Sequence, residues 1–427
     1  MCAKHYVKPK KYNAFRTGTM CAMSQNTEEQ VKLLKEAGID FFTHRFGNEP
    51  NEADINLLGW LEKYGVEVTG ISNNTRKSIN DGTTVFDKDK VCNMWYKDSP
   101  MFTEYLMNDE PGMCEFEHVQ KSIEDFLEVF PDKTPYVNLL PMYANTDQLK
   151  GGAWKAPIEY FDGQSCYKQY LQEYVDKVKT HYIGVDIYPF RRKPMAGMED
   201  KYPAYYDLLY YKDYMKNIEL VADACRENGR DLWAYIQTCS WHCNIRDPNE
   251  EEIRWQAYCM ISFGVRTLEY YTFANAGGGP KTGAPIDVRG CPTKAYFAVK
   301  RMALGMKKIS DLYVSYRSVG AFNVNSSPEK TPYLELYNPY KDFKPISEVK
   351  CNTPLLVGCF DKIEGEGHAF TLVNCQDFAT PETANIKVKI DGKVTMYYDG
   401  EPTVLTSDDG WYDFTLTQGD GVFVTVD

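Results

Sequence analysis

Two adjacent carboxyl groups stand where an apolar stretch of the sequence stops. The run MFTEYLM is followed by Asn108, Asp109 and Glu110, and a Pro-Gly pair then interrupts any regular strand. One interpretation is structural, because an acidic residue ahead of Glu-Pro suits the start of a helix. The other is chemical, because two carboxyl groups at one strand end can carry out acid–base catalysis. Other polar residues that reach the same place decide between the two.

The elements around this stretch repeat in a regular order. Amphipathic helices end at glycine and lead within a few residues into apolar strands, as at Gly38, Gly65, Gly229 and Gly264. Such short helix-to-strand connections are typical of α/β folds. We expect eight strands, at residues 16–23, 39–45, 66–72, 101–109, 135–141, 182–188, 231–238 and 265–273.

Eight strands, each followed by a helix, predict a (β/α)8 TIM barrel, with the segment 293–312 as its eighth helix. A doubly wound sheet is the alternative, and the absence of a glycine-rich phosphate fingerprint after the first strand disfavours it. Beyond the barrel the pattern changes to short alternating strands separated by Gly, Asp, Asn and Pro. We therefore predict a catalytic barrel over residues 1–312 and a small all-β sandwich over residues 313–427.

The longest connections follow the strands, which places them at the end of a barrel where active sites are built. Polar and aromatic residues at these strand ends and in these loops form the candidate substrate-binding set: Arg45, Asp109, Asn138, Trp154, Tyr188, Gln237, Trp241 and Tyr271. The aromatic rings can stack on sugar rings, although each ring alone is more often ordinary packing. Gln237 ends an otherwise apolar strand, where its amide could bind a substrate hydroxyl.

Two further carboxyl groups are candidates to act with Glu110. Asp186 lies between two apolar residues, so strand alternation predicts that its side chain points into the barrel. A bond from Asp186 to Arg45 or to other barrel groups is the structural alternative. Glu269 is a third carboxyl if it points inward, and otherwise a partner for Arg266 or an outer helix.

Composition and motifs disfavour several other classes of function. The formal net charge is −12, which does not suit binding to nucleic acid. No apolar stretch is long enough for a membrane span, and the N-terminus as it stands is no signal peptide. The 13 scattered cysteines fit a reducing, cytoplasmic location, with an exported form possible if a signal was removed. The spacing of Cys239, His242 and Cys243 matches no standard zinc site, so we expect neither metal nor cofactor.

A series of segments resembles the barrel of β-galactosidase-like glycoside hydrolases from polysaccharide-degrading bacteria: YLMNDEPG, YVNLLPMY, VDIYPF, WAYIQ, IRWQAYCMISFGVRTLEYYTF and a Pro-Thr-x-x-Tyr helix. The resemblance covers roughly residues 13–312 and implies Glu110 as the general acid/base. This chain has Asp109 where the family usually has Asn, and its seventh strand carries Gln237 instead of the nucleophilic Glu. The second carboxyl therefore does not carry over, and we prefer Asp186 with Glu269 in reserve.

Two carboxyl groups suit the cleavage of a glycosidic bond. One protonates the leaving oxygen, and the other attacks or stabilises the anomeric centre or activates water. We expect a glycoside hydrolase for short glycans or glycosides, either retaining or inverting, in an unspecified oligomeric state. A barrel that binds carbohydrate without catalysis is the alternative. A metal-dependent hydrolase is disfavoured because no strand carries an H-x-H pair.

Overall fold

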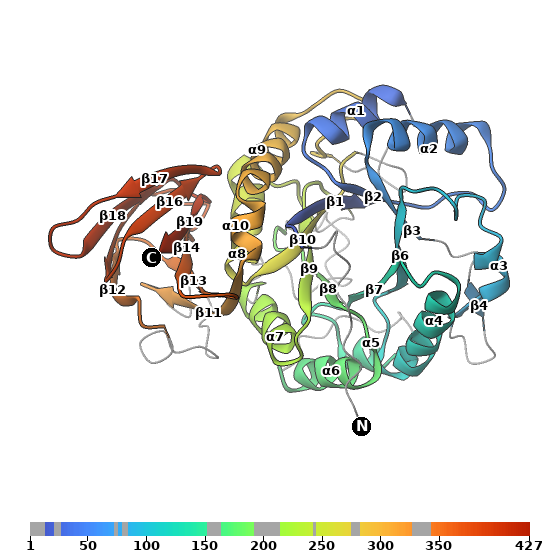
Figure 1. Cartoon of the computed structure of the whole chain (residues 1–427), viewed down its shortest axis with the longest axis horizontal. Helices are drawn as coiled ribbons and strands as arrows, with labels where there is room; N and C mark the ends of the chain where they lie inside the picture. The colour runs from blue at the N-terminus through green and yellow to red at the C-terminus, as the bar shows by residue number, and fades with distance from the viewer. Residues whose placement is uncertain are drawn as a thin grey trace, which may run out of the picture.

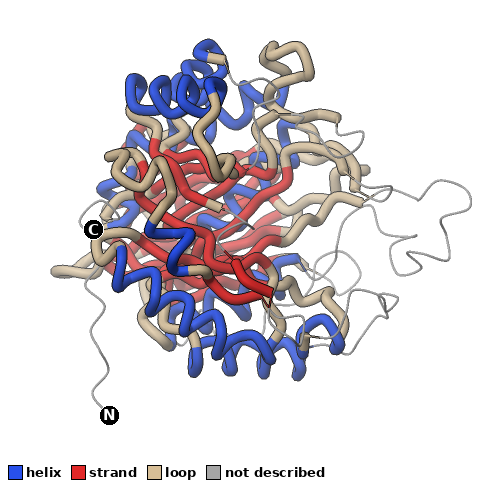
Figure 2. Tube along the Cα trace, turned by 90° about the vertical axis from the view of Figure 1, so that its right-hand side faces the viewer, coloured by secondary structure: helices blue, strands red, loops and turns tan. Residues whose placement is uncertain are grey.

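The computed structural model describes residues 13–20, 27–71, 76–78, 84–151, 164–191, 214–241, 245–274, 282–326 and 343–427. It contains a closed barrel ringed by helices and, beside it, a pair of antiparallel sheets (Figure 1). In the side view of Figure 2, helices lie on both sides of the barrel strands. Both parts of the predicted architecture are therefore confirmed.

Eight parallel strands close the barrel in the spatial order β1-β2-β3-β6-β7-β8-β9-β10. They are β1 (Arg16–Met20), β2 (Phe41–His44), β3 (Glu67–Gly70), β6 (Phe102–Asp109), β7 (Thr134–Leu139), β8 (Tyr182–Asp186), β9 (Asp231–Gln237) and β10 (Val265–Tyr271). Each overlaps a strand that the sequence predicts, and all eight are shorter than predicted. A separate hairpin of β4 (Arg76–Ser78) and β5 (Thr84–Phe86) was not expected.

The helices around the barrel are α1 (Glu28–Glu36), α2 (Glu52–Tyr64), α3 (Lys88–Cys92), α4 (Phe116–Val129), α5 (Thr146–Lys150), α6 (Gln164–Lys177), α7 (Tyr214–Glu227), α8 (Glu250–Ser262), α9 (Lys294–Lys308) and α10 (Ser310–Val314). A short 3-10 turn, Met113–Glu115, precedes α4. Local sequence explains their ends. The Asn51 side chain caps the N-terminus of α2, and Gly65 ends that helix at φ 61°.

The barrel interior holds its own cluster of side chains, separate from the core between strands and helices. Trp233 stacks on Tyr136, with ring centroids 4.0 Å apart. The Arg16 guanidinium pairs with the fully buried Glu104 and lies 2.6 Å from a Glu67 oxygen. This interior is a packed and partly charged core, so a substrate must bind above it at the rim.

The second part is a β-sandwich. One sheet has the order β11-β13-β14-β19-β16-β17 and the other β12-β15-β18, built from β11 (Tyr316–Val324), β12 (Ile346–Cys351), β13 (Leu355–Lys362), β14 (His368–Asn374), β15 (Ala384–Ile390), β16 (Val394–Tyr398), β17 (Glu401–Leu405), β18 (Trp411–Leu416) and β19 (Gly421–Val426). Alternate residues of β15 are buried and exposed, as one covered face requires. Arg254 of α8 forms a buried ion pair with Asp420, which ties the sandwich to the barrel.

None of the helices in the described part of the chain combines the length and the apolar character needed to cross a membrane.

Candidate active site

A bulge in β6 decides which residues of the Asn-Asp-Glu run face the barrel axis. Leu106 pairs with Tyr136 of β7; the register then shifts, so that Asp109 pairs with Asn138. Tyr136 belongs to the interior cluster, and Asn138, two residues further on, lies on the same face of β7. The extra residue therefore turns Asp109, rather than Asn108, toward the interior.

One buried amide links the ends of three strands. The Asn138 side-chain nitrogen donates hydrogen bonds to Asp109 Oδ1 and to Asp186 Oδ1, each at 3.0 Å. The two carboxyl oxygens therefore lie no farther apart than twice that distance. Among the described residues, the Asn138 side-chain oxygen has no hydrogen-bond partner, although the residue is only 4% exposed. The Asn138 side chain thus has a buried acceptor that no described group satisfies.

Glu110 adds a third carboxyl group to this cluster. Its N–H donates to the Asn138 carbonyl at 2.8 Å, and its backbone has φ 53°, in the left-handed region. This conformation costs a non-glycine residue about 1–2 kcal/mol. The side chain is partly buried. Burial, and then the negative charges of Asp186 and Asp109, raise the pKa of Glu110 well above its usual range.

Asp186 ends β8 with its side chain inward, as strand alternation predicts. Burial and the charge of Asp109 raise the pKa of Asp186 to about 7, against hydrogen bonds from Asn138 and Tyr188 that lower it. Asn138 is thus the partner of Asp186, whereas Arg45 follows β2 with an exposed side chain. A site with two raised carboxyl pKa values can hold a proton on one group near neutral pH while the other is ionised.

Three of the predicted aromatic residues meet at the same end of the barrel. The ring of Tyr188 lies 4.5 Å from that of Trp241 and 5.5 Å from that of Tyr271, between centroids. Trp241 and Tyr271 contact each other edge to face at 4.9 Å and remain partly exposed. They follow or end β8, β9 and β10. Trp154, the fourth predicted ring, lies outside the described residues.

Glu269 also points inward, and it is fully buried in the barrel. Thr43 Oγ1 donates to Glu269 Oε1 at 2.7 Å, and Trp233 Nε1 donates to its Oε2 at 3.0 Å. Arg266, the alternative partner, donates instead to the backbone carbonyls of Tyr313 and Tyr316. Interior side chains thus already donate a hydrogen bond to each carboxyl oxygen of Glu269. We therefore infer a structural role for Glu269 and keep it out of the proposed catalytic pair.

The burial of Glu269 predicts a pH-dependent stability. Burial raises its pKa to about 8, so between about pH 4.5 and 8 the folded state holds a proton that the unfolded state releases. Its contribution to the free energy of unfolding therefore falls as the pH rises through this window. Glu269→Gln mimics the protonated acid, with an acceptor for Trp233 and a donor for Thr43. We expect its stability relative to the wild type, measured by urea denaturation, to increase from pH 5 to pH 8; a constant difference would contradict this assignment.

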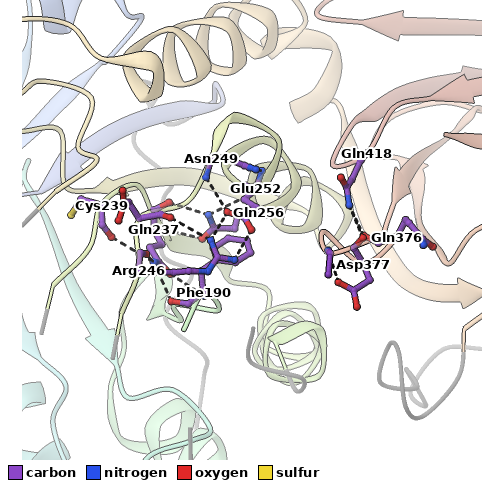
Figure 3. Close-up of polar contacts among 12 residues, drawn as sticks. Phe190, Gln237, Cys239, Arg246, Asn249, Glu252, Gln256, Gln376, Asp377 and Gln418 are labelled. Atoms are coloured by element: carbon purple, nitrogen blue, oxygen red, sulfur yellow. Dashed lines mark hydrogen bonds and ion pairs between the residues drawn. The ribbon is translucent and has the colours of Figure 1, made fainter. Parts of the chain in front are cut away.

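Gln237 has backbone partners, and this changes its interpretation. Figure 3 shows its amide among the loops that follow β8 and β9. Its Oε1 accepts from the Phe190 N–H at 3.1 Å, and its Nε2 donates to the Arg246 carbonyl. Its own N–H donates to Gln256 Oε1 of α8 at 2.8 Å. Gln237 thus holds two loops together, and we leave it out of the proposed substrate contacts.

The sequence analysis assigned no role to Tyr136 and Tyr235, whose hydroxyl groups lie 2.6 Å apart in the interior. Each lies two residues before a predicted site residue, Asn138 and Gln237, so strand alternation alone could have placed both rings under the site. Tyr235 pairs in the strand register with Asp186 of β8 on one side and with Glu269 of β10 on the other, so it lies between these two carboxyl residues.

Within the described part of the chain, no group of three or more His, Cys, Asp or Glu side chains is placed to hold a metal ion. His242 and Cys243, which the sequence analysis weighed as metal ligands, lie outside the described residues.

Comparison with known proteins extends the picture of the fold. No protein-family model and no curated protein matches this sequence. Among solved structures, a catalytic mutant of a GH42 β-galactosidase from G. stearothermophilus aligns over 97% of this chain and 98% of its own, with a TM-score of 0.59 and 9% identity. The two chains share a fold. The resemblance to β-galactosidase-like barrels is therefore confirmed at the level of architecture.

Two other solved structures align more loosely. An α-L-arabinofuranosidase from Thermotoga maritima has a TM-score of 0.45 at 10% identity, over 99% of this chain and 98% of its own. A β-galactosidase from the psychrophilic Marinomonas ef1 has a TM-score of 0.44 at 11% identity, over 69% of this chain, and the alignment spans only 60% of that enzyme.

Proposed function

We propose that the protein is a glycoside hydrolase, with Glu110 and Asp186 as its catalytic carboxyl groups. The observation that carries the proposal is the rim cluster: Asp109, Glu110 and Asp186 meet around the amide of Asn138 at the C-terminal ends of β6, β7 and β8. A pure binding site would hold sugars with amides and aromatic rings, at less cost than three neighbouring carboxyl groups. The similarity in fold to a β-galactosidase is consistent with this function.

In this proposal we give each carboxyl group a separate task. Glu110, whose pKa is raised by burial and by two negative neighbours, keeps a proton for the leaving glycosidic oxygen. Asp186, in its ionised form, attacks or stabilises the anomeric centre directly, or it activates a water molecule that attacks this centre. The side-chain nitrogen of Asn138 holds the carboxyl groups of Asp109 and Asp186 in place. The partly exposed rings of Trp241 and Tyr271 offer apolar surface to the sugar ring.

A screen of aryl glycosides tests the proposed function. The set should include both anomers of the common hexoses and pentoses, with product release and saccharide binding measured in parallel. We expect turnover of at least one glycoside, lost in Asp186→Asn, which keeps the acceptor for Asn138. Saccharide binding without turnover across the whole set would instead support the non-catalytic carbohydrate-binding barrel.

Asp109 gives the site a predicted pH dependence. Its charge raises the pKa of both Glu110 and Asp186. Asp109→Asn removes that charge, keeps an oxygen for Asn138, and should therefore lower both pKa values. Because the acid must be protonated, we expect the alkaline limb of the kcat/KM profile to move to lower pH. An unchanged profile would show that Asp109 does not act on the proton donor electrostatically.

A further inference from the structure

A concave site opens between two segments that connect barrel strands. A cleft of about 450 Å³ opens between the segment that follows β2 and the segment that includes α3 and the residues after it. Gly47 and Glu49 lie on one side, and Asp89, Asn93 and Trp95 lie on the other. Because β3 separates β2 from β6, the segment after β2 leaves the barrel two strands from Glu110, at the same end.

Trp95 is a fixed and partly exposed wall of this cleft. Its Nε1 donates to the Gly47 carbonyl at 3.1 Å, so the ring ties the two sides together. Phe46 and Tyr96 contact the indole edge to face, with centroids 5.3 and 5.6 Å away. A ring held in this way loses little conformational entropy when a ligand packs against it.

The polar lining indicates the charge of the ligand. Glu49 and Asp89 are exposed, and Asp87 is buried at the start of α3. Lys90 is the lysine among the lining residues, and its Nζ is 3.9 Å from a carboxyl oxygen of Asp87. Carboxylates therefore outnumber cations, which disfavours uronate, sulfate or phosphate groups. Amides and carboxylates beside an indole suit the hydroxyl groups and apolar face of an uncharged sugar.

We propose that this cleft is a distal subsite, which binds an uncharged sugar unit of the same glycan that is cleaved beside Glu110. The inference rests on the proposed function, and it makes an oligosaccharide a better substrate than a monoglycoside.

The test compares aryl glycosides of one sugar that carry one to four sugar units. For the wild type we expect kcat/KM to rise with chain length. Trp95→Ala should reduce the ratio of kcat/KM for the tetrasaccharide to that for the monoglycoside roughly tenfold, mainly through KM. For Trp95→Phe, which keeps a ring and loses the bond to Gly47, we expect a ratio between those of the wild type and Trp95→Ala. This second variant keeps the test decisive if the alanine variant misfolds.

The control is Trp411→Ala, at a partly exposed tryptophan of the sandwich, which should leave the ratio unchanged. For aryl glycosides of a uronate-containing chain, we expect kcat/KM not to rise with chain length. If the glycosides are hydrolysed and the ratio of kcat/KM for the tetrasaccharide to that for the monoglycoside is the same in the wild type and Trp95→Ala, the subsite is overturned. The proposed function then still stands. If no glycoside is hydrolysed, the proposed function fails. Calorimetric titration with the neutral tetrasaccharide then still tests the cleft as a sugar-binding site. Weaker binding to Trp95→Ala than to the wild type supports it, and equal binding or no binding overturns it.

Discussion

Glu110→Gln is expected to lower kcat/KM for a glycoside with a poor leaving group by about 10²- to 10⁴-fold, the usual contribution of a general acid. The amide keeps the shape of the side chain but has no acidic proton to give. Burial already favours the neutral acid at this position, so a neutral amide should not destabilise the fold. Saccharide binding, measured by calorimetry, should persist in the variant.

The matched control is Glu117→Gln, the same change at an exposed position of α4. It should retain wild-type kcat/KM. Full activity of Glu110→Gln, or an equal loss in both variants, would remove Glu110 from the mechanism.

Arg16→Met is expected to lower the free energy of unfolding by about 3–5 kcal/mol, as breaking a buried ion pair does. Arg16 is only 5% exposed and pairs with both Glu104 and Glu67 inside the barrel. Methionine fills much of the same volume but leaves Glu104 buried without its cation. Urea denaturation at pH 7 measures the loss.

A second variant separates the charge effect from packing. In Arg16→Met combined with Glu104→Gln, the uncompensated charge is gone, so part of the lost stability should return. Arg289→Met removes an exposed pair with Asp287 and should cost less than about 1 kcal/mol. If Arg16→Met costs no more than Arg289→Met, the interior ion pair does not stabilise the barrel.

The architecture could be predicted because its signals are local. Glycine joints such as Gly65 and Gly229 have positive φ angles in the structure, and each ends a helix just before a strand. Asp186 faces inward because a strand alternates with a period of two, which two apolar neighbours are enough to reveal. Such features depend on residues that are close together in the chain.

The detail of the site depends on pairing between distant segments. Nothing near Asp109 in the sequence reveals the β6 bulge, which is a register shift against β7. Alternation also leaves the surroundings of an inward carboxyl open: Asp186 and Glu269 both pair with Tyr235 in the strand register, yet Glu269 is fully buried among interior side chains, whereas Asp186 ends its strand beside Asn138. For the same reason the sequence could not show that Gln237 bonds to the loop carbonyls.

The central claim is that Glu110 delivers a proton to the leaving group, and one measurement tests it most directly. It is the ratio of wild-type to Glu110→Gln kcat/KM across glycosides of the same sugar with increasingly acidic leaving groups. A dinitrophenolate needs little protonation to depart, whereas a sugar alcohol needs it fully. We predict a large ratio for the alcohol that shrinks toward one for the dinitrophenyl glycoside. A ratio that stays constant along the series would contradict the assignment of Glu110 as the acid.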